Sequence, residues 1–322
     1  MLTLDSVKAL LEDDIAANND FIVSELDSDV DLINQVNQHI ITGGKRLRPL
    51  FLMLVARALG YDGRKHCKAA AIIEFIHTAT LLHDDVVDQS ALRRGKKTVN
   101  YLFGNPASVL TGDFLYSRAF QMMVDLDEVP VMRILADATN VIAKGEILQL
   151  LNCNNPKITE KQYMEVIYCK TAKLFEAACD ISAILARATE SNKMAVHHYG
   201  IHLGNAFQIA DDVLDYVSDA DTMGKNVGDD LAEGKVTLPI IYALDRVNKS
   251  DRVLIEKAIT EEKCAEIGTI LNLVKSSGAI EASTQKAESE ANLAKNSIDM
   301  LPASIYKDAL ISLCDLVVNR AM

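Results

Sequence analysis

The chain has 322 residues, of which 49% are apolar, and its formal net charge is −12. This length and apolar content suffice for a sizeable core, which excludes a disordered protein. The acidic balance excludes general nucleic-acid binding, because phosphate backbones attract basic surfaces. Residues 1–15 are too acidic for a signal peptide, and no uncharged apolar stretch reaches the ~18 residues of a membrane-spanning helix. We therefore expect a cytoplasmic protein without a transmembrane segment.

Apolar residues recur at three- and four-residue spacing along most of the chain, which predicts helices nearly throughout. The predicted helices cover residues 5–20, 27–42, 48–59, 65–89, 106–126, 130–152, 160–188, 192–217, 237–249, 252–261, 263–275, 278–299 and 303–320. Thr159 and Gln162 predict a capping box at the start of the seventh of these helices. Because no Gly/Ser-rich linker divides the chain, we expect residues 1–322 to form one all-α domain.

The cysteines agree with an intracellular location. The sequence has no C-x-x-C pair, and its cysteines occupy positions 67, 153, 169, 179, 264 and 314. We therefore expect reduced, mostly buried thiols rather than disulfides.

The first segment with clear chemistry is residues 43–49, Gly-Gly-Lys-Arg-Leu-Arg-Pro. It combines a flexible glycine pair with cations and with a proline at the start of a predicted helix. Backbone donors and cationic side chains could converge there on an anion. A basic loop that merely closes a helix remains an equally good interpretation of this segment alone.

An acidic motif, D-D-x-x-D, ends the helix predicted over 65–89. On that helix His77, Asp84 and Asp88 fall within roughly 40° of one another, so they share one face. Asp85 adds a third carboxylate beside this face. Carboxylate oxygens are the ligands that Mg²⁺ prefers, which makes a metal site one interpretation of the motif and a solvated acidic surface the other.

Two further segments could bind phosphate. Arg93 and Arg94 follow the acidic motif directly, and arginine suits bidentate phosphate contacts, although an arginine pair is often an ordinary surface feature. Lys170 and Thr171 lie inside the helix predicted over 160–188. Thr171 could bond to the preceding turn or to a ligand oxygen. A snorkelling lysine beside a core threonine is the better explanation of this pair when it is considered alone.

A second D-D-x-x-D motif occupies Asp211, Asp212 and Asp215, and Gln208 shares its helical face. Exposed like charges one turn apart cost only ~0.2–0.5 kcal/mol per pair, so one such motif could be solvated. Carboxylates ~5 Å apart in a cleft of effective dielectric ~20 repel by about 3 kcal/mol per pair, and therefore need cations. Two copies on apolar helices favour a shared metal site.

The segment from 224 to 234 is the most loop-like part of the chain, because glycines and charges gather there. Lys225 and Lys235 flank its Gly-Asp-Asp sequence at 228–230. We expect this segment to act as a lid that carries lysines toward an anion.

Together these segments resemble the trans-prenyltransferases, the head-to-tail isoprenyl diphosphate synthases. The resemblance rests, in the family's order, on residues 43–49, 77–95, 112–113, 170–171, 208–215 and 228–235. It implies an all-α fold of the isoprenoid synthase type: a large single-domain helical bundle with a central cavity faced by both acidic motifs, assembled as a homodimer. The whole chain looks like long-chain bacterial members that make an octaprenyl product, about C40, for respiratory quinone side chains.

The resemblance also assigns roles. Roughly two or three Mg²⁺ ions would be held by Asp84, Asp85, Asp88, Asp211, Asp212 and Asp215. The allylic prenyl diphosphate would be contacted by Arg93, Lys170, Thr171, Gln208, Lys225 and Lys235. Isopentenyl diphosphate would be held by Lys45, Arg48, His77 and Arg94. The residues that resemblance marks as catalytic are Asp84, Asp88, Lys170 and Asp211.

Product length can be argued from steric access. Short-chain relatives carry bulky aromatic residues one turn before the first acidic motif, whereas this chain has Ala79 and Thr80 there. An octaprenyl tail needs a path of about 40 Å, at about 5 Å per isoprene unit or helical turn. Met122, Met123 and Leu135 are candidates for the floor of that path, although core packing explains each of them individually. Contact with a membrane would assist release of so apolar a product.

Other functions remain open at this stage. A product one unit shorter or longer, roughly C35 or C45, fits the same motifs. A terpene cyclase also ionises prenyl diphosphates, but it has no use for a second set of anion-binding residues. A non-catalytic subunit that sets product length would not need intact acidic motifs.

Overall fold

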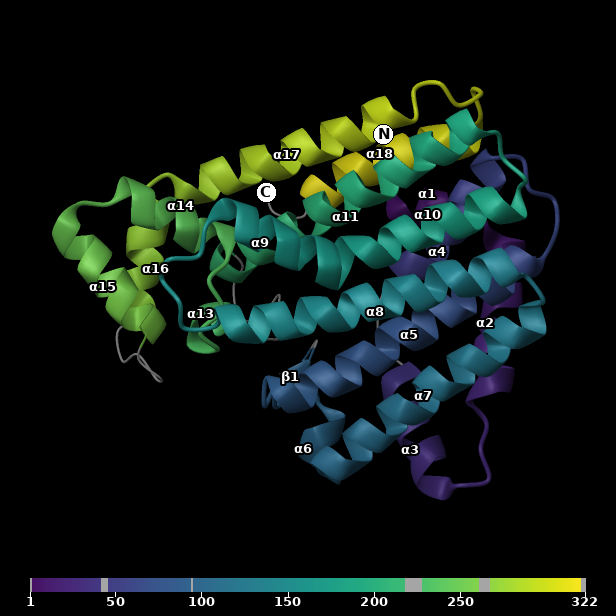
Figure 1. The fold of residues 1–322 in the computed structure, drawn as a ribbon, viewed down its shortest axis with the longest axis horizontal. Helices are drawn as coiled ribbons and strands as arrows, with labels where there is room; N and C mark the ends of the chain where they lie inside the picture. The colour runs from purple at the N-terminus through teal and green to yellow at the C-terminus, as the bar shows by residue number, and fades with distance from the viewer. Residues whose placement is uncertain (1, 42–45, 94, 218–227, 261–266, 320–322) are drawn as a thin grey trace. The chain divides into compact units, whose positions relative to one another are not determined.

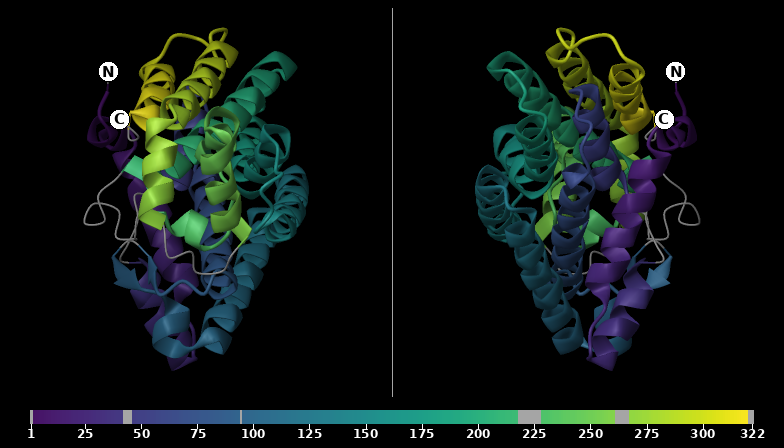
Figure 2. Two further views of the ribbon diagram at one scale, coloured as in Figure 1. Left: turned by 90° about the vertical axis from the view of Figure 1, so that its left-hand side faces the viewer. Right: turned by 90° about the vertical axis from the view of Figure 1, so that its right-hand side faces the viewer.

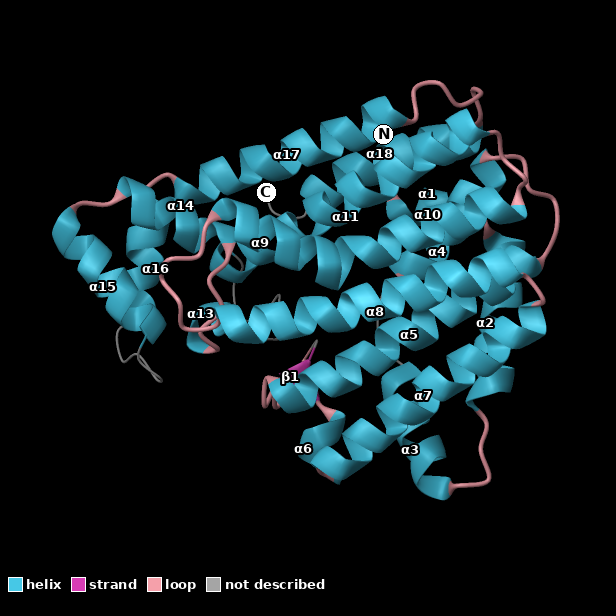
Figure 3. Cartoon of the chain, in the orientation of Figure 1, coloured by secondary structure: helices cyan, strands magenta, loops and turns pink. Residues whose placement is uncertain are grey.

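A computed structural model describes residues 2–41, 46–93, 95–217, 228–260 and 267–319, and these residues are almost entirely helical (Figure 3). The helices are α1 (Leu4–Ala9), α2 (Glu12–Leu26), α3 (Asp31–Ile41), α4 (Leu47–Ala58), α5 (Lys65–Val87), α6 (Val99–Phe103), α7 (Asn105–Leu126), α8 (Val129–Asn152), α9 (Glu160–Ile167), η1 (Tyr168–Ala172), α10 (Lys173–Leu185), α11 (Glu190–Val217), α13 (Asp229–Ala232), α14 (Leu238–Arg246), α15 (Lys249–Thr260), α16 (Ile267–Ser276), α17 (Ala279–Ser297) and α18 (Ile305–Val318). A short antiparallel hairpin pairs β1 (Leu92–Arg93) with β2 (Lys96–Lys97).

Most predicted helices are confirmed, and the exceptions have local causes. The helix predicted over 5–20 is wrong, because Leu11 leaves the helical region (φ −122°, ψ 25°) and separates α1 from α2. The helix predicted over 160–188 is interrupted by η1, a π-helix, and ends at Leu185. The hairpin, α6 and α13 lie in segments for which no element was predicted. The capping box is confirmed, because Thr159 and Gln162 satisfy each other's backbone N–H groups.

The chain forms two compact units. Unit 1 consists of residues 1–139, 177–197 and 300–312, and unit 2 of residues 140–176, 198–299 and 313–322. The first acidic motif belongs to unit 1, and the second belongs to unit 2.

In unit 1 the long helix α5 packs against α2, α4 and α7, and Figures 1 and 2 show it running beside α7. A Cβ atom at Gly112 of α7 would lie 2.4 Å from Nε2 of His83, so glycine permits this close approach. The core around α5 includes the fully buried side chains Phe51, Leu52, Ile72, Ile76 and Leu115. This packing fixes the end of α5 at which the acidic motif lies.

A buried polar network joins α2, α4 and α5 within unit 1. The Arg57 guanidinium donates two hydrogen bonds to Asp14, at 2.8 and 2.6 Å, and His66 Nε2 lies 3.1 Å from the same carboxylate. Cys67 completes a group close enough to hold a metal ion. Burial raises the pKa of the Cys67 thiol to about 12, and Arg57 already neutralises Asp14, so this group stabilises the fold rather than binding a cation.

Unit 2 has its own core, in which α14 packs against α9, α15, α16 and α17. Its buried cluster contains Tyr216, Ile240, Ile255, Ile259 and Val274. Tyr216 belongs to α11, so this cluster anchors the end of the helix that carries the second acidic motif.

The structure also shows the state of the cysteines and the character of the helices. Cys67, Cys169, Cys179 and Cys314 are buried free thiols and Cys153 is half-buried, as expected, whereas Cys264 lies outside the described residues. Within the described ranges, no helix combines the length and the apolar character needed to cross a membrane.

Candidate active site

The first acidic motif ends α5 in unit 1. Asp84 and Asp85 lie in the last turn, and Asp88 is the C-cap residue, whose N–H donates to the Asp84 carbonyl at 2.8 Å. Asp84 and Asp88 are half-buried, whereas Asp85 is only 4% exposed. The motif therefore offers two partly accessible carboxylates and one buried carboxylate.

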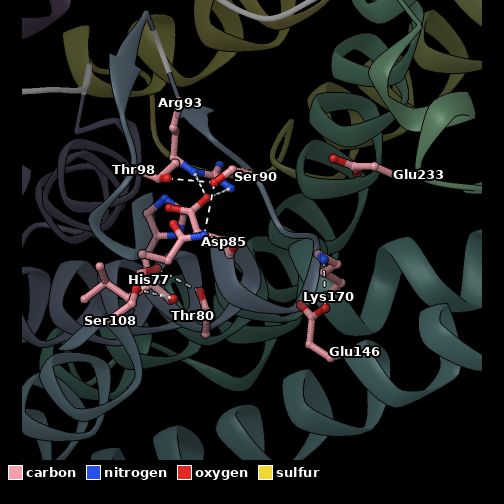
Figure 4. Close-up of polar contacts among 12 residues, drawn as sticks. His77, Thr80, Asp85, Ser90, Arg93, Thr98, Ser108, Glu146, Lys170 and Glu233 are labelled. Carbon is pink, nitrogen blue, oxygen red and sulfur yellow. Dashed lines mark hydrogen bonds and ion pairs between the residues drawn. The ribbon is translucent and has the colours of Figure 1, made fainter. Parts of the chain in front are cut away.

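Asp85 is held by the hairpin that follows α5 (Figure 4). Nε and a terminal nitrogen of Arg93 each lie 2.7 Å from Oδ1 of Asp85. Asn100 donates to the Asp85 carbonyl at 2.9 Å, and Thr98 donates to Ser90 at 2.7 Å, which ties the hairpin to the helix end. The predicted diphosphate ligand Arg93 is thus placed directly beside the motif by a hairpin that no sequence pattern had predicted.

Two predicted isopentenyl diphosphate ligands meet in unit 1. The Arg48 guanidinium, from α4, donates to Nε2 of His77, from α5, at 2.9 Å. Both side chains are half-buried. His77 belongs to the helical face that Asp84 and Asp88 continue, so a basic pair precedes the acidic motif along α5.

The second motif lies near the end of α11 in unit 2, and its polar side chains form a continuous chain. Thr171 donates to Gln208 at 2.7 Å, and Gln208 donates to Asp212 at 2.7 Å. The Tyr163 hydroxyl donates to the other Asp212 oxygen at 2.6 Å. Asp212 and Asp215 are each 4% exposed, whereas Asp211 is exposed.

The electrostatics of this motif favour a cation. Burial raises the pKa of Asp212 well above its usual range, and the negative charges of Asp230 and Asp211 raise it further. Hydrogen bonds from Tyr163 and Gln208 act in the opposite direction but do not cancel the effect of burial. A divalent ion would stabilise these neighbouring carboxylates as anions.

The π-helix η1 presents Lys170 and Thr171, and two glycines allow its neighbours to approach it closely. A Cβ atom at Gly145 of α8 would lie 2.7 Å from Cβ of Cys169. A Cβ atom at Gly204 of α11 would lie 2.5 Å from Cα of Ala172. Single π-helical turns are frequent at functional sites, and this one separates α9 from α10 where the predicted substrate ligands lie.

The segment after the second motif adds one more carboxylate and a lysine. The Asp230 N–H donates to Asp215 at 3.4 Å, so Asp230 lies beside the motif. Lys235 pairs with Glu233 at 2.6 Å, and the Lys170 ammonium pairs with Glu146 at 2.7 Å.

Some predicted site residues lie outside the described ranges, and for others the structure gives burial but does not test the predicted role. Lys45, Arg94 and Lys225 lie outside the described residues. Ala79, Met123 and Leu135 are buried, and Thr80 is half-buried and donates to the His77 carbonyl at 2.8 Å. Their proposed role in product length stays a prediction.

Sequence reasoning missed three polar residues of unit 2. Asp230 lies in the Gly-Asp-Asp sequence at 228–230, and the two successive carboxylates in that loop-like segment were a usable signal. Tyr163 and Glu146 gave no signal, because each reaches its partner only through tertiary packing.

Comparison with known proteins identifies the family. The family model described as polyprenyl synthetase matches residues 30–275. The chain belongs to this family. It is 48% identical to octaprenyl diphosphate synthase of Escherichia coli (strain K12), over 99% of both chains. It is also 43% identical to the geranyl-diphosphate-specific all-trans-nonaprenyl-diphosphate synthase of Rhodobacter capsulatus, over 98% of this chain and 97% of that protein.

Solved structures agree with this membership. The polyprenyl synthase of Caulobacter crescentus CB15, complexed with calcium and isoprenyl diphosphate, matches with a TM-score of 0.96 and 43% identity, over 99% of this chain and 98% of that one. The predicted fold class, an all-α fold of the isoprenoid synthase type, is thereby confirmed. Members of the polyprenyl synthetase family use divalent metal ions.

Proposed function

We propose that this chain is a long-chain trans-prenyltransferase that adds isopentenyl diphosphate units head-to-tail to an allylic diphosphate, preferably farnesyl diphosphate. The proposed product is octaprenyl diphosphate for a respiratory quinone side chain. The main support for this product length is the 48% identity with the E. coli octaprenyl diphosphate synthase over 99% of both chains. The nonaprenyl relative, at 43%, makes a product one unit longer the main alternative.

The two substrates have separate candidate ligands. Arg48 and His77, which contact each other, support a site for isopentenyl diphosphate in unit 1 together with the predicted Lys45 and Arg94. Lys170, Thr171 and Gln208 support a site for the allylic diphosphate in unit 2 together with Lys225 and Lys235. Arg93 is also proposed to contact the allylic diphosphate. Guanidinium and ammonium groups suit diphosphate oxygens because they donate charge-assisted hydrogen bonds.

Roughly two or three Mg²⁺ ions fit the donor set. Asp84 and Asp88 are half-buried carboxylates one turn apart, and the second motif gathers Asp211, Asp212 and Asp215. The raised pKa of Asp212 supports this fit, since a buried carboxylate beside other carboxylates is stabilised as an anion by a cation. When bound, Mg²⁺ would neutralise the diphosphate and make it a better leaving group.

The chain's own residues then act on the charge that develops. As the allylic C–O bond ionises, the Lys170 ammonium and the Arg93 guanidinium stabilise the negative charge on the departing diphosphate. The double bond of isopentenyl diphosphate, held by Arg48 and His77, attacks the allylic cation and forms the new C–C bond. A proton is then lost to the released diphosphate. The apolar helices around the motifs exclude water, which would otherwise capture the cation.

The proposed tail path begins one turn before the first motif. Ala79 is fully buried in α5, and its methyl group leaves more room than the aromatic residues of short-chain relatives. Met123 and Leu135 remain the proposed floor. An octaprenyl diphosphate is strongly apolar, so we also propose brief membrane contact during its release by an otherwise cytoplasmic enzyme.

A homodimer is supported by a set of exposed apolar side chains on unit 1. The set consists of Tyr101, Leu102 and Phe103 of α6 and Leu110, Phe120 and Val124 of α7, which are 36–66% exposed. The two helices pack against each other. Exposed apolar side chains on neighbouring helices suit an interface, and we propose a second copy of this chain as the partner. Sedimentation of the purified protein measures this, and a monomer at micromolar concentration would contradict it.

We also propose that residues 1–322 function as one domain. Four of the five boundaries between the two units fall inside helices, namely α8, α10, α11 and α18, and the fifth, at 299/300, falls in the loop between α17 and α18. A domain boundary normally falls in an exposed linker, so these continuous helices support a single domain. A single cooperative unfolding transition that is the same by two probes would agree with this proposal.

Product analysis tests the proposed function. The purified chain is incubated with Mg²⁺, farnesyl diphosphate and labelled isopentenyl diphosphate, and the products are separated by length. We expect a ladder of intermediates that ends at eight units. A ladder that stops at three or four units would refute the long-chain assignment. Conversion of the allylic substrate without incorporation of label would instead favour a terpene cyclase.

A further inference from the structure

We propose that Glu146 is a positioning residue for Lys170, which it holds in the orientation that receives the allylic diphosphate. This inference rests on the function proposed above. Glu146 belongs to α8 and Lys170 to η1, and both lie in unit 2. Glu146 does not touch the substrate in this proposal but acts through Lys170.

The contact is short and partly shielded. Nζ of Lys170 lies 2.7 Å from Oε2 of Glu146, and Figure 4 shows the two side chains pointing toward each other. The side chains are 23% and 30% exposed. Solvent therefore screens this pair less than a fully exposed one, and the carboxylate restricts where the ammonium can lie.

The backbone on both sides of the pair is fixed. Glu146 directly follows Gly145, a residue at which α8 approaches η1 closely, because a Cβ atom there would lie 2.9 Å from the backbone nitrogen of Lys170. On another side of η1, Gly204 allows α11 to contact Ala172. The two helices hold the main chain of η1, so the remaining freedom of Lys170 lies in its long side chain.

A lysine at a diphosphate site needs such restraint. Its side chain loses much rotamer entropy when it is ordered, and a partner that orders it beforehand reduces the cost at the moment of binding. An ammonium has three N–H donors, so pairing with one carboxylate does not exhaust its capacity for diphosphate oxygens. Protein kinases use a glutamate in the same way to position the lysine that contacts ATP phosphates.

The neighbouring residue links this pair to the second acidic motif. Thr171 follows Lys170 and donates to Gln208, which in turn donates to Asp212. Thr171 is thereby held by the Gln208 amide on α11, whereas Lys170 is held by a carboxylate on α8. The two helices together position adjacent residues of η1 for one substrate.

The chain provides a control pair that joins α8 to α9, the helix that directly precedes η1. Glu165 of α9 pairs with Lys144 of α8 at 3.6 Å, and these side chains are 53% and 60% exposed. This pair has the same charges but includes no proposed substrate ligand. A substitution of Glu165 therefore measures the effect of losing an ordinary surface ion pair from these elements.

A double-mutant cycle on the full chain tests the inference. The variants are Glu146→Ala, Lys170→Ala, the double variant, Glu146→Gln and Glu165→Ala, assayed with farnesyl diphosphate and labelled isopentenyl diphosphate. We expect Glu146→Ala to lower kcat/KM for farnesyl diphosphate about 10-fold, or about 1.4 kcal/mol, with KM for isopentenyl diphosphate unchanged. The double variant should be no slower than Lys170→Ala alone, because Glu146 acts through Lys170. Glu146→Gln, which keeps an acceptor oxygen, should recover part of the loss, and Glu165→Ala should stay within twofold of wild type.

Independent effects of Glu146→Ala and Lys170→Ala would overturn the inference, as would a lowered KM for farnesyl diphosphate in Glu146→Ala. The latter result would mean that Glu146 competes with the diphosphate for Lys170. Circular dichroism melts of each variant exclude losses that come from unfolding. Failure of the proposed function has a different signature, namely wild-type protein that incorporates no isopentenyl diphosphate at all.

Discussion

Gly204→Ala should reduce turnover far more than it reduces stability. A Cβ atom at this position of α11 would lie 2.5 Å from Cα of Ala172 and 2.7 Å from its Cβ. Ordinary contacts begin near 3.4 Å, and the nearest atom belongs to the backbone of η1, which cannot rotate away. The substitution must therefore move α11 and η1 apart by roughly 1 Å.

The magnitude follows from two opposing effects on stability. Overpacking of this kind costs about 1–3 kcal/mol, and the better helix propensity of alanine returns about 1 kcal/mol. The net loss of unfolding free energy should be about 0–2 kcal/mol. A displacement of ~1 Å would also lengthen the 2.7 Å hydrogen bond from Thr171 to Gln208 beyond useful range. Misplacement by ~1 Å can cost about 100-fold in rate, so kcat should fall by roughly 10- to 100-fold.

Steady-state turnover and urea unfolding, followed by circular dichroism at 222 nm, measure the two effects on the same samples. Gly268→Ala is the control, since a Cβ atom at this position of α16 would meet nothing within 4 Å. That variant should keep wild-type turnover and gain about 0.4–1 kcal/mol of stability. If Gly204→Ala kept turnover within twofold of wild type, the close approach would not position η1, and the reasoning would be wrong.

Three further predictions concern pH, product length and metal. Burial lowers the pKa of His66. Burial alone would raise the pKa of Asp14, but hydrogen bonds from Arg57 and His66 outweigh that effect and lower it. Both groups bind more protons when unfolded, so the unfolding free energy should fall as pH drops, first below the usual histidine pKa of about 6.5 and then below about 4 for the carboxyl. His66→Gln should flatten the first part of this profile in urea unfolding, and an unchanged slope would contradict it. Ala79→Tyr should shorten the product while turnover continues, as judged by product chromatography, and an unaltered ladder would mean that the tail runs elsewhere. Chelation with EDTA should abolish prenyl transfer and added Mg²⁺ should restore it, whereas activity that survives exhaustive chelation would refute the metal assignment.

Most of the fold could be predicted because helix formation depends on local periodicity. The capping box at Thr159 and the long helices around both acidic motifs were set by residues close together in the sequence. The break between α1 and α2 could not be predicted, because the apolar pattern continues through Leu10 and Leu11 while the backbone turns. The π-helix η1 could not be predicted either, because no local sequence pattern marks it. Its extra residue is accommodated by packing against helices that are distant in the sequence.

The candidate site was predicted unevenly. Carboxylates and cations that occur as short motifs were found, and the contacts of Arg48 with His77 and of Thr171 with Gln208 bring predicted residues together. Partners supplied by other helices were missed, because nothing near Glu146 in the sequence indicates its distant lysine. The sequence identifies groups with the right chemistry, whereas tertiary packing decides which of them restrain one another.

The two acidic motifs have the same spacing but different electrostatic environments, and this difference argues against treating them as interchangeable halves of one metal site. In the first, the buried Asp85 is neutralised by the Arg93 guanidinium at 2.7 Å, so the motif already contains a cation of its own. In the second, the described partners of the buried Asp212 are a phenol and an amide, and the charge of Asp230 raises its pKa. Neutral donors satisfy lone pairs without balancing charge. Asp212 therefore depends more on an external cation than Asp85 does, even though the spacing alone would make the two residues equal.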